Sequence, residues 1–238
     1  MRLGDDWNFD PLVVGPLLAV TWLYLRSLRR LAYVPRLAFG AGLIVLFAAL
    51  VSPLHALAEV SLSAHMAQHA LLVAIVPPLL LIGNPAAVFA WGGARSSLRL
   101  ASFLQPLSRP APAATLHGLG LWVWHAPLAF QAAAQSYGWH VLQHLTFFIT
   151  ALFFWRSIVG ARSAGRAAAA LGAAFITLLH SGLLGALITL VPYSLYGSAT
   201  LEDQQLAGLV MWVPVGMVYL AACLVLARRL LIAHSLQG

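Results

Sequence analysis

Long apolar stretches separated by short arginine-bearing connections are the feature that most constrains this chain. A helix that crosses a lipid bilayer needs about 20 mostly apolar residues, and seven stretches of the 238-residue sequence come close to or exceed that length. They are Leu12–Leu28, Leu37–Ala56, Leu62–Ile82, Ala113–Phe130, Trp139–Val159, Ala167–Leu190 and Gln204–Leu231. The sequence therefore predicts an all-α fold, a polytopic membrane bundle of seven transmembrane helices that forms one integral membrane domain over residues 1–238.

The composition excludes the common alternatives. The chain is 61% apolar and 8% charged, against roughly 45–50% and about 25% in soluble domains. Its net charge of +7 comes from arginines that interrupt apolar stretches, so we expect a lipid bilayer and no nucleic acid as partner. A single cysteine, Cys223, excludes a disulfide framework and a cysteine-based metal site. The segment before Leu12 carries no basic n-region, so we expect the first apolar stretch to be retained.

The charged residues sort to opposite sides of the seven predicted spans. One side takes twelve of the thirteen arginines: Arg26, Arg29, Arg30, Arg36, Arg95, Arg99, Arg109, Arg156, Arg162, Arg166, Arg228 and Arg229. The other side takes Arg2 and all six acids: Asp5, Asp6, Asp10, Glu59, Glu202 and Asp203. Because arginine-rich connections stay in the cytoplasm, we expect the N-terminus outside and the C-terminus in the cytoplasm. Two local features complete this prediction, a kink at Pro77-Pro78 and a short surface helix around Ser96–Leu104.

Nine histidines outnumber the acids, and seven of them fall in the predicted outer half of the bilayer. His65 and His69, and likewise His140 and His144, form an H-x-x-Q-H motif whose two imidazoles leave one face of a helix. The two motifs begin parallel spans at matching depth, so we expect the four imidazoles to converge on a metal ion. Polar residues in a bilayer are costly, and this favours a functional role. His125 and His180 come from neighbouring spans at similar depth and complete or support the predicted site.

The types of ligand residue narrow the choice of metal. Imidazole suits copper, zinc, iron and nickel, and Met66 and Met211 would favour Cu(I) if they faced the cluster. We interpret His55 and His117 as ordinary hydrogen-bonding residues between helices. The segment Glu202–Gln205 has two interpretations, a cap on the last span or an access point for cations. Whether His55, Met66, Met211 or Asp203 joins the site stays open.

A set of motifs in a fixed order extends along most of the chain. They are Trp7, Asp10-Pro11, Ser52-Pro53, Ser63–His69, Pro77-Pro78-Leu79-Leu80, Gly83-x-Pro85, Trp124-His125-x-Pro127, His140 with His144, His180-Ser181-Gly182, Glu202–Gly208 and Trp212-Val213-Pro214. This set resembles the CtaG-type cytochrome c oxidase assembly factors of bacteria. The resemblance implies a non-enzymatic, multi-pass protein of the bacterial inner (plasma) membrane that helps load copper into a haem–copper oxidase. It also implies an oxidase subunit as partner and allows a periplasmic copper donor.

Two other functions remain open at this stage. A haem-b membrane redox protein would use two of the histidines as axial ligands, although histidines four apart on one helix are poorly placed for opposite faces of a haem. A metal-free scaffold would hold an oxidase subunit during assembly. We expect copper as the bound metal, ahead of haem or another transition metal.

Overall fold

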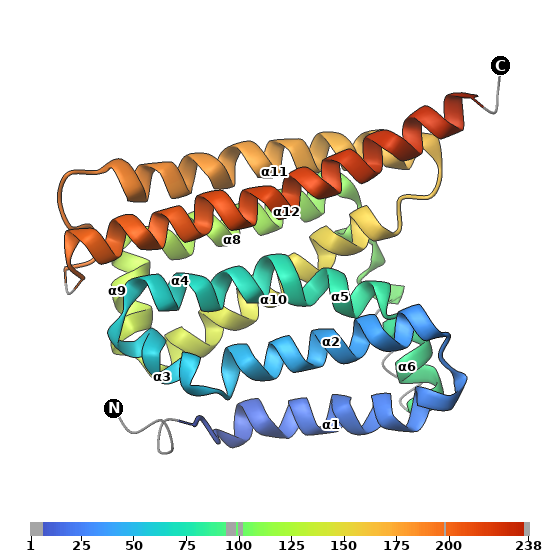
Figure 1. Cartoon of the computed structure of the whole chain (residues 1–238), viewed down its shortest axis with the longest axis horizontal. Helices are drawn as coiled ribbons and strands as arrows, with labels where there is room; N and C mark the ends of the chain where they lie inside the picture. The colour runs from blue at the N-terminus through green and yellow to red at the C-terminus, as the bar shows by residue number, and fades with distance from the viewer. Residues whose placement is uncertain (1–6, 94–98, 100–101, 198, 236–238) are drawn as a thin grey trace.

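The computed structural model describes residues 7–93, 99, 102–197 and 199–235, and their regular structure is entirely helical. The elements follow in the order α1 (Pro11–Ser27), η1 (Leu28–Arg30), α2 (Tyr33–Leu50), α3 (Pro53–Val60), α4 (Leu62–Ala70), η2 (Leu71–Ile75), α5 (Val76–Ile82), α6 (Pro85–Gly92), η3 (Gln105–Ser108), α8 (Pro110–His125), α9 (Pro127–Gln135), α10 (Tyr137–Val159), α11 (Ala164–Leu190) and α12 (Leu201–Ser235). The long helices lie side by side, and the first and last described residues lie at opposite ends of the bundle (Figure 1).

Six helical segments in the described part of the chain are long and apolar enough to cross a membrane. They are Pro11–Arg30, Tyr33–Leu50, Leu62–Ile82, Tyr137–Val159, Ala164–Leu190 and Leu201–Ala233. The predicted fourth span corresponds to α8, which has 16 residues and is therefore about 24 Å long, below the roughly 30 Å of a hydrocarbon core. Because α8 packs along α10 and α11, it belongs to the same bundle although it is short.

Two predicted spans were drawn too long because a proline starts a new helix inside each. The span predicted to end at Ala56 ends at Leu50, and the hydroxyl of Ser52 accepts a hydrogen bond from the backbone N–H of Leu54 to begin α3. The span predicted to reach Phe130 ends at His125, since Ala126 before Pro127 is extended and a residue before proline avoids the helical conformation. The resulting short helices α3 and α9 lie at one end of the bundle (Figure 1).

Where the sequence predicts a kink or break at Pro77-Pro78, the structure has a π-helical turn, Leu71–Ile75, one residue before the two prolines. Pro77 has no N–H to donate to the carbonyl of Val73 four residues earlier. The indole N–H of Trp155 on α10 donates to that carbonyl instead, at 2.8 Å. The helix axis thus continues into α5 with the freed backbone group satisfied by a neighbouring helix, as a membrane interior requires.

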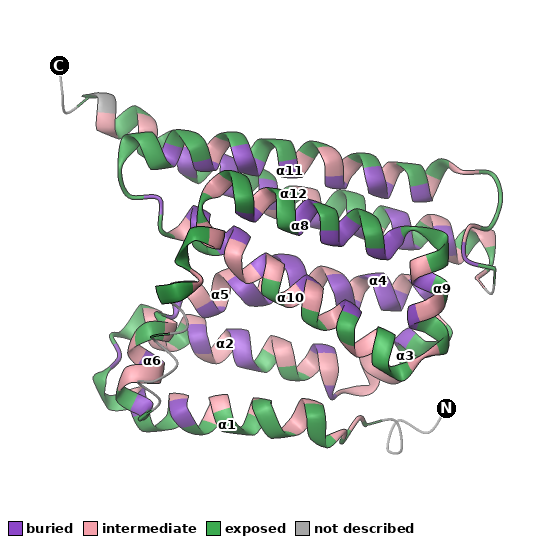
Figure 2. Ribbon diagram, turned by 180° about the vertical axis from the view of Figure 1, so that it is seen from behind, coloured by how far each residue is buried: buried purple, intermediate pink, exposed green. Residues whose placement is uncertain are grey.

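The core lies between α4, α8, α10, α11 and α12, whereas α1 is peripheral. In the most apolar stretch of α1 only 6% of the residues are buried inside the protein, and its outer face is coloured as exposed in Figure 2. Large apolar side chains such as Leu18 and Leu25 are more than half exposed there, which fits a helix whose outer face contacts lipid.

Helices α11 and α12 approach closely where glycines remove side chains. A Cβ atom on Gly185 would lie 2.9 Å from the backbone nitrogen of Trp212 and 3.0 Å from the carbonyl oxygen of Gly208. Small residues at such contacts let backbones pack closely in a membrane.

Several predictions fall outside the described residues: those for Arg2, Asp5, Asp6 and Arg95, and most of the surface helix around Ser96–Leu104. In the described part of the chain, the opposite charges line separate clefts. Asp10, Glu59 and Asp203 line one, and a group of arginines that includes Arg156 and Arg162 lines the other.

Candidate metal centre

The two H-x-x-Q-H motifs lie next to each other, on α4 and α10. The ring centroids are 4.2 Å apart for His65 and His69 and 4.3 Å apart for His140 and His144. Between the motifs, the His69 and His144 centroids are 5.1 Å apart and those of His65 and His140 are 5.6 Å apart. Four imidazoles from two helices therefore form a single cluster.

A fifth imidazole reaches this cluster from the end of α8. The ring of His125 lies 6.1 Å from that of His69. Its Nδ1 donates a hydrogen bond to the carbonyl oxygen of Leu121 at 2.6 Å, because a carbonyl can only accept. The Nε2 of His125 is therefore left with a free lone pair, as in many metal-binding histidines whose other nitrogen is held by a carbonyl.

The cluster contains buried ring nitrogens without hydrogen-bond partners. They are Nε2 of His65, both nitrogens of His69, and Nε2 of His125, His140 and His144. Buried polar atoms are nearly always satisfied, and leaving one unpaired costs about 1–3 kcal/mol. One ligand atom each from His65, His69 and His144 lie within 4.8 Å of one another. The donor set thus fits a metal ion that accepts imidazole lone pairs.

A cleft of about 900 Å³ leads from the end of the bundle that carries α3 and α9 to these imidazoles. His65, His140 and His144 line it, whereas the buried His69 and His125 do not. The cleft gives the outer imidazoles contact with the surroundings and leaves two deeper ones beyond them.

Three carboxylates also line this cleft, those of Asp10, Glu59 and Asp203. The hydroxyl of Tyr137 and the backbone N–H of Leu12 donate to Asp10, and these hydrogen bonds lower the pKa of Asp10 below its ordinary value. Negative charge is thereby maintained at the cleft, where it raises the local concentration of cations.

Asp203 lies in the first turn of α12 and also caps a second helix, α4, a role that was not expected from the sequence. Its carboxylate accepts hydrogen bonds from the backbone N–H groups of Leu62 at 2.6 Å and Ser63 at 3.1 Å, and from the hydroxyl of Ser61 at 3.1 Å. These residues begin α4, directly before His65. The start of α12 therefore positions the first histidine motif, while Asp203 also lines the cleft.

The neighbouring Gln204 fixes the connection between α11 and α12. Its side-chain oxygen accepts from the backbone N–H of Leu195 at 2.6 Å, and its nitrogen donates to the carbonyl oxygens of Tyr193 and Ile188 at 3.1 and 3.3 Å. The whole Glu202–Gln205 segment thus lies at the end of the bundle that carries the histidines.

The glutamine inside each motif has a buried side chain. Gln68 donates to the carbonyl oxygen of Ala49 at 2.7 Å and lies 3.2 Å from Nδ1 of His55. His55 therefore has the hydrogen-bonding role expected from the sequence, and its ring also lies 6.2 Å from that of His140. Gln143 is fully buried, and both polar atoms of its amide lack partners. Sequence reasoning missed these glutamines, although their shared place in H-x-x-Q-H was visible.

His180 lies apart from the five clustered imidazoles. Its Nδ1 accepts a hydrogen bond from the indole of Trp122 at 3.4 Å, and its ring packs against Gly118 of α8. Among the described residues no ring contact joins it to the cluster, so the structure does not bring this predicted ligand together with the others.

His117 and the two methionines occupy core positions. Nε2 of His117 lies 3.0 Å from the hydroxyl of Tyr219, and its Nδ1 lies 3.3 Å from that of Thr150. These partners agree with its interpretation as a hydrogen-bonding residue between helices. Met66 and Met211 are buried in the hydrophobic core.

Comparison with protein-family models gives a match that covers nearly the whole bundle. The model described as cytochrome c oxidase caa3 assembly factor (Caa3_CtaG) matches residues 19–232. No curated protein and no solved structure shows significant similarity to the chain.

Proposed function

The chain belongs to the cytochrome c oxidase caa3 assembly factor family, and from this premise we propose that it carries copper for the assembly of a haem–copper oxidase. The observation that supports copper binding is the set of buried ring nitrogens without partners on five neighbouring histidines. A transition-metal ion would satisfy these lone pairs, and copper is the metal that the client oxidase requires. In this proposal copper is cargo, and the protein catalyses no reaction.

The proposed topology has seven spans, with α8 as a short fourth one. An odd number of spans puts the start of α1 and the end of α12 on opposite sides of the bilayer, and these two lie at opposite ends of the bundle in Figure 1. Because the arginines gather at the end opposite the histidines, the positive-inside rule directs the histidine cleft outward. The protein would then lie in the bacterial inner membrane with its copper site open to the periplasm.

The arrangement of the imidazoles supports transfer of an ion as well as storage. His140 and His65 line the open cleft, whereas His69 and His125 lie behind them. The ring contacts pass from His140 through His65 to His69 and on to His125 without a gap. A copper ion can therefore exchange one imidazole for the next, because it always remains within reach of a further lone pair. A periplasmic donor and an oxidase subunit would both approach from the cleft side.

A metal ion fits this cluster better than haem does. Each ring of the cluster contacts at least one other, at 4.2–6.1 Å between centroids, and Phe147 packs against both His69 and His125. A haem needs two imidazoles on opposite faces of a flat macrocycle. The close packing of the rings leaves no such slot between them.

Copper stoichiometry of the purified full-length protein tests the proposal. We expect the wild type to bind Cu(I), and the variant His65→Ala/His69→Ala to lose that binding. His180→Ala serves as the matched control, because it removes a histidine of the same bundle that lies outside the cluster. Unchanged copper binding in the double variant, or a haem absorption band in the wild-type protein, would overturn the proposal. Oxidase copper content in a deletion strain complemented with each variant then links binding to assembly.

A further inference from the structure

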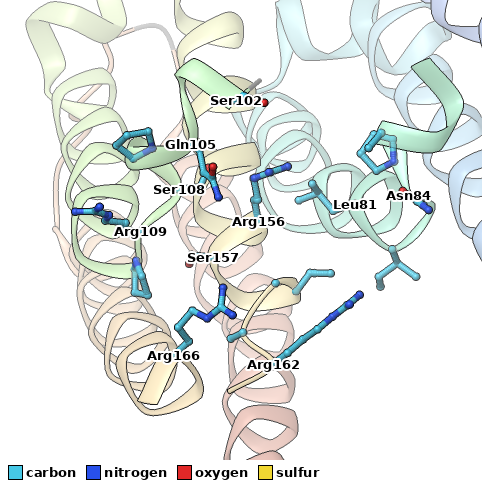
Figure 3. A pocket seen from close by; sticks show the side chains of 18 of the residues that line it. Leu81, Asn84, Ser102, Gln105, Ser108, Arg109, Arg156, Ser157, Arg162 and Arg166 are labelled. Carbon is cyan, nitrogen blue, oxygen red and sulfur yellow. The ribbon is translucent and has the colours of Figure 1, made fainter. Parts of the chain in front are cut away.

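A second cleft, of about 1430 Å³, lies at the opposite end of the bundle from the histidines. Arginines from several elements surround it, as Figure 3 shows for the four that it labels. Arg109 precedes α8, Arg156 lies near the end of α10, Arg162 lies between α10 and α11, and Arg166 lies in the first turn of α11. Arg229 of α12 completes the set.

This cleft has strong positive charge without counter-ions in the described part of the chain. The only ion pair found among the described residues joins His55 to Glu59 at the histidine end. Of the four described carboxylates, Asp10, Glu59 and Asp203 line the other cleft, and Glu202 begins α12 beside Asp203. Guanidinium groups stay charged at all physiological pH values, so five positive charges converge on one hollow.

Backbone groups add to the positive potential. The first turns of α8 and α11 both border the cleft, and neither helix has a side-chain hydrogen bond at its N-cap. A helix N-terminus carries about half a positive charge. The first turn of α11 also leaves backbone N–H groups without intrahelical partners, whereas α8 begins Pro110-Ala111-Pro112 and its prolines have no N–H to donate. Arg229 donates to the carbonyl oxygens of Ile158 and Ala161, at 3.2 Å each, and so holds α12 against this end of α10.

From these features we propose that the arginine cleft binds a phosphate-bearing anion. Arginine forms paired hydrogen bonds with phosphate oxygens, and helix N-termini favour the same ligand. The headgroup of an anionic phospholipid is the source that the surroundings favour. Apolar side chains, among them Leu81, Ile82 and Phe103, border the cleft and offer contact to acyl chains, and basic pockets between membrane helices are known sites for such headgroups.

The positive-inside rule alone explains arginines on this side but not their convergence on a hollow. Arg29, Arg30 and Arg228 satisfy the same rule and do not line the cleft. Arg29 and Arg30 are exposed, like Arg156 and Arg162, and they lie at the same end of the bundle (Figure 1). The pairs Arg156→Gln/Arg162→Gln and Arg29→Gln/Arg30→Gln therefore remove equal charge from the same side, inside and outside the cleft.

Thermal stabilisation of the delipidated full-length protein in neutral detergent measures binding, since a ligand of the folded state raises Tm. The probes are phosphatidylglycerol in mixed micelles, phosphatidylcholine in mixed micelles, and inorganic pyrophosphate without lipid. We expect phosphatidylglycerol to raise the Tm of the wild type and of the Arg29/Arg30 variant. The Arg156/Arg162 variant should need about tenfold more of it for the same shift.

The arms of this experiment separate the two sources of phosphate. A response to pyrophosphate alone that the Arg156/Arg162 variant loses would keep the cleft and assign it to a soluble phosphate compound. Equal responses of both double variants, or no response of the wild type to either phosphate probe, would overturn the proposal. Arg162→Gln alone, in the connection outside the helices, keeps the test valid if the double variant fails to fold.

Discussion

The two ends of this bundle solve the problem of placing polar groups at a membrane in opposite ways. The histidine end buries imidazole nitrogens without hydrogen-bond partners, whereas the arginine end keeps the charged side chains around its cleft exposed. An imidazole can lose its charge and enter the interior as a neutral ligand, but a guanidinium cannot. The histidine site is therefore built within the fold, and the arginine site is built on its surface.

This difference predicts that the two sites fail independently. A site within the fold depends on neighbouring helices for its geometry, as shown by Asp203 of α12, which caps α4. A surface site depends mainly on the charged side chains that line it. Each prediction below changes one end and uses the other end, or a neighbouring residue, as its control.

The largest effect is expected when each site is removed in turn and the binding of both copper and phosphatidylglycerol is measured. His140→Ala/His144→Ala should weaken copper binding about 100-fold or more, because removing ligands costs more than removing their supports. The same variant should keep the full Tm response to phosphatidylglycerol. Arg156→Gln/Arg162→Gln should show the reverse, with wild-type copper affinity and a reduced lipid response.

Competition with a Cu(I) chelator and the lipid titration, run on the same preparations, provide both measurements. Loss of both ligands in either double variant would show that the ends are coupled or that the fold has collapsed. Far-UV circular dichroism separates these two explanations.

Asp203→Ala should produce the largest loss of stability among single substitutions at the histidine end. The change removes the acceptor of three hydrogen bonds at the start of α4, and at about 1 kcal/mol for each bond the cost is about 3 kcal/mol. For a chain of this size that corresponds to a fall in Tm of about 6–12 °C.

Glu202→Ala is the matched control, because it removes the same charge from the adjacent, exposed position. It should change Tm by no more than a degree or two, as surface substitutions do. Equal losses for the two variants would mean that the negative charge of this segment matters and its hydrogen bonds to α4 do not.

The sequence predicted the parts of this arrangement that depend on local pattern. The spacing of His65 with His69 placed two imidazoles on one helix face. Pro77-Pro78 predicted a kink or break in the third span, and the structure has a π-helical turn just before these prolines. Such features follow from 3.6 residues per turn and from the missing N–H of proline, so they can be predicted from one short stretch of sequence.

The features that sequence reasoning missed depend on contacts between distant segments. Asp203 lies about 140 residues from the helix that it caps, and no local pattern encodes that pairing. His180 was expected to join the site because its depth matched, but depth does not fix the direction of a side chain around a helix, and it packs against Gly118. From the sequence, the arginines indicated only the orientation of the spans. Their convergence on one cleft could not be predicted, because it depends on how four helices pack together.

The two ends of α11 also differ in how tightly they pack. Gly185→Ala should destabilise the protein by about 1–2 kcal/mol, because the added Cβ would lie 2.9 Å from the backbone of Trp212. Gly172→Ala, nearer the arginine end of the same helix, meets nothing within 4 Å and should be neutral or slightly stabilising, since alanine is the better helix former. Thermal unfolding of the two variants measures the contrast. Equal Tm values would argue that α12 shifts easily away from α11.

The smallest effect is expected at the hydrogen bond from the hydroxyl of Tyr137 to the carboxylate of Asp10, which joins the start of α10 to the start of α1. Tyr137→Phe removes the donor that contributes most to the lowered pKa of Asp10, so that pKa should rise toward its ordinary value. A lowered carboxyl pKa stabilises the folded state above the ordinary Asp pKa of about 3.9 and loses that contribution as pH falls through the lowered value. The Tm difference between wild type and Tyr137→Phe should therefore be present at pH 6 and shrink below about pH 4.

Tyr33→Phe, which removes a hydroxyl at the arginine end of the bundle, should show no such pH dependence. A Tm difference that stays constant from pH 6 to pH 3 would mean that the hydroxyl of Tyr137 acts through packing and not through the charge of Asp10.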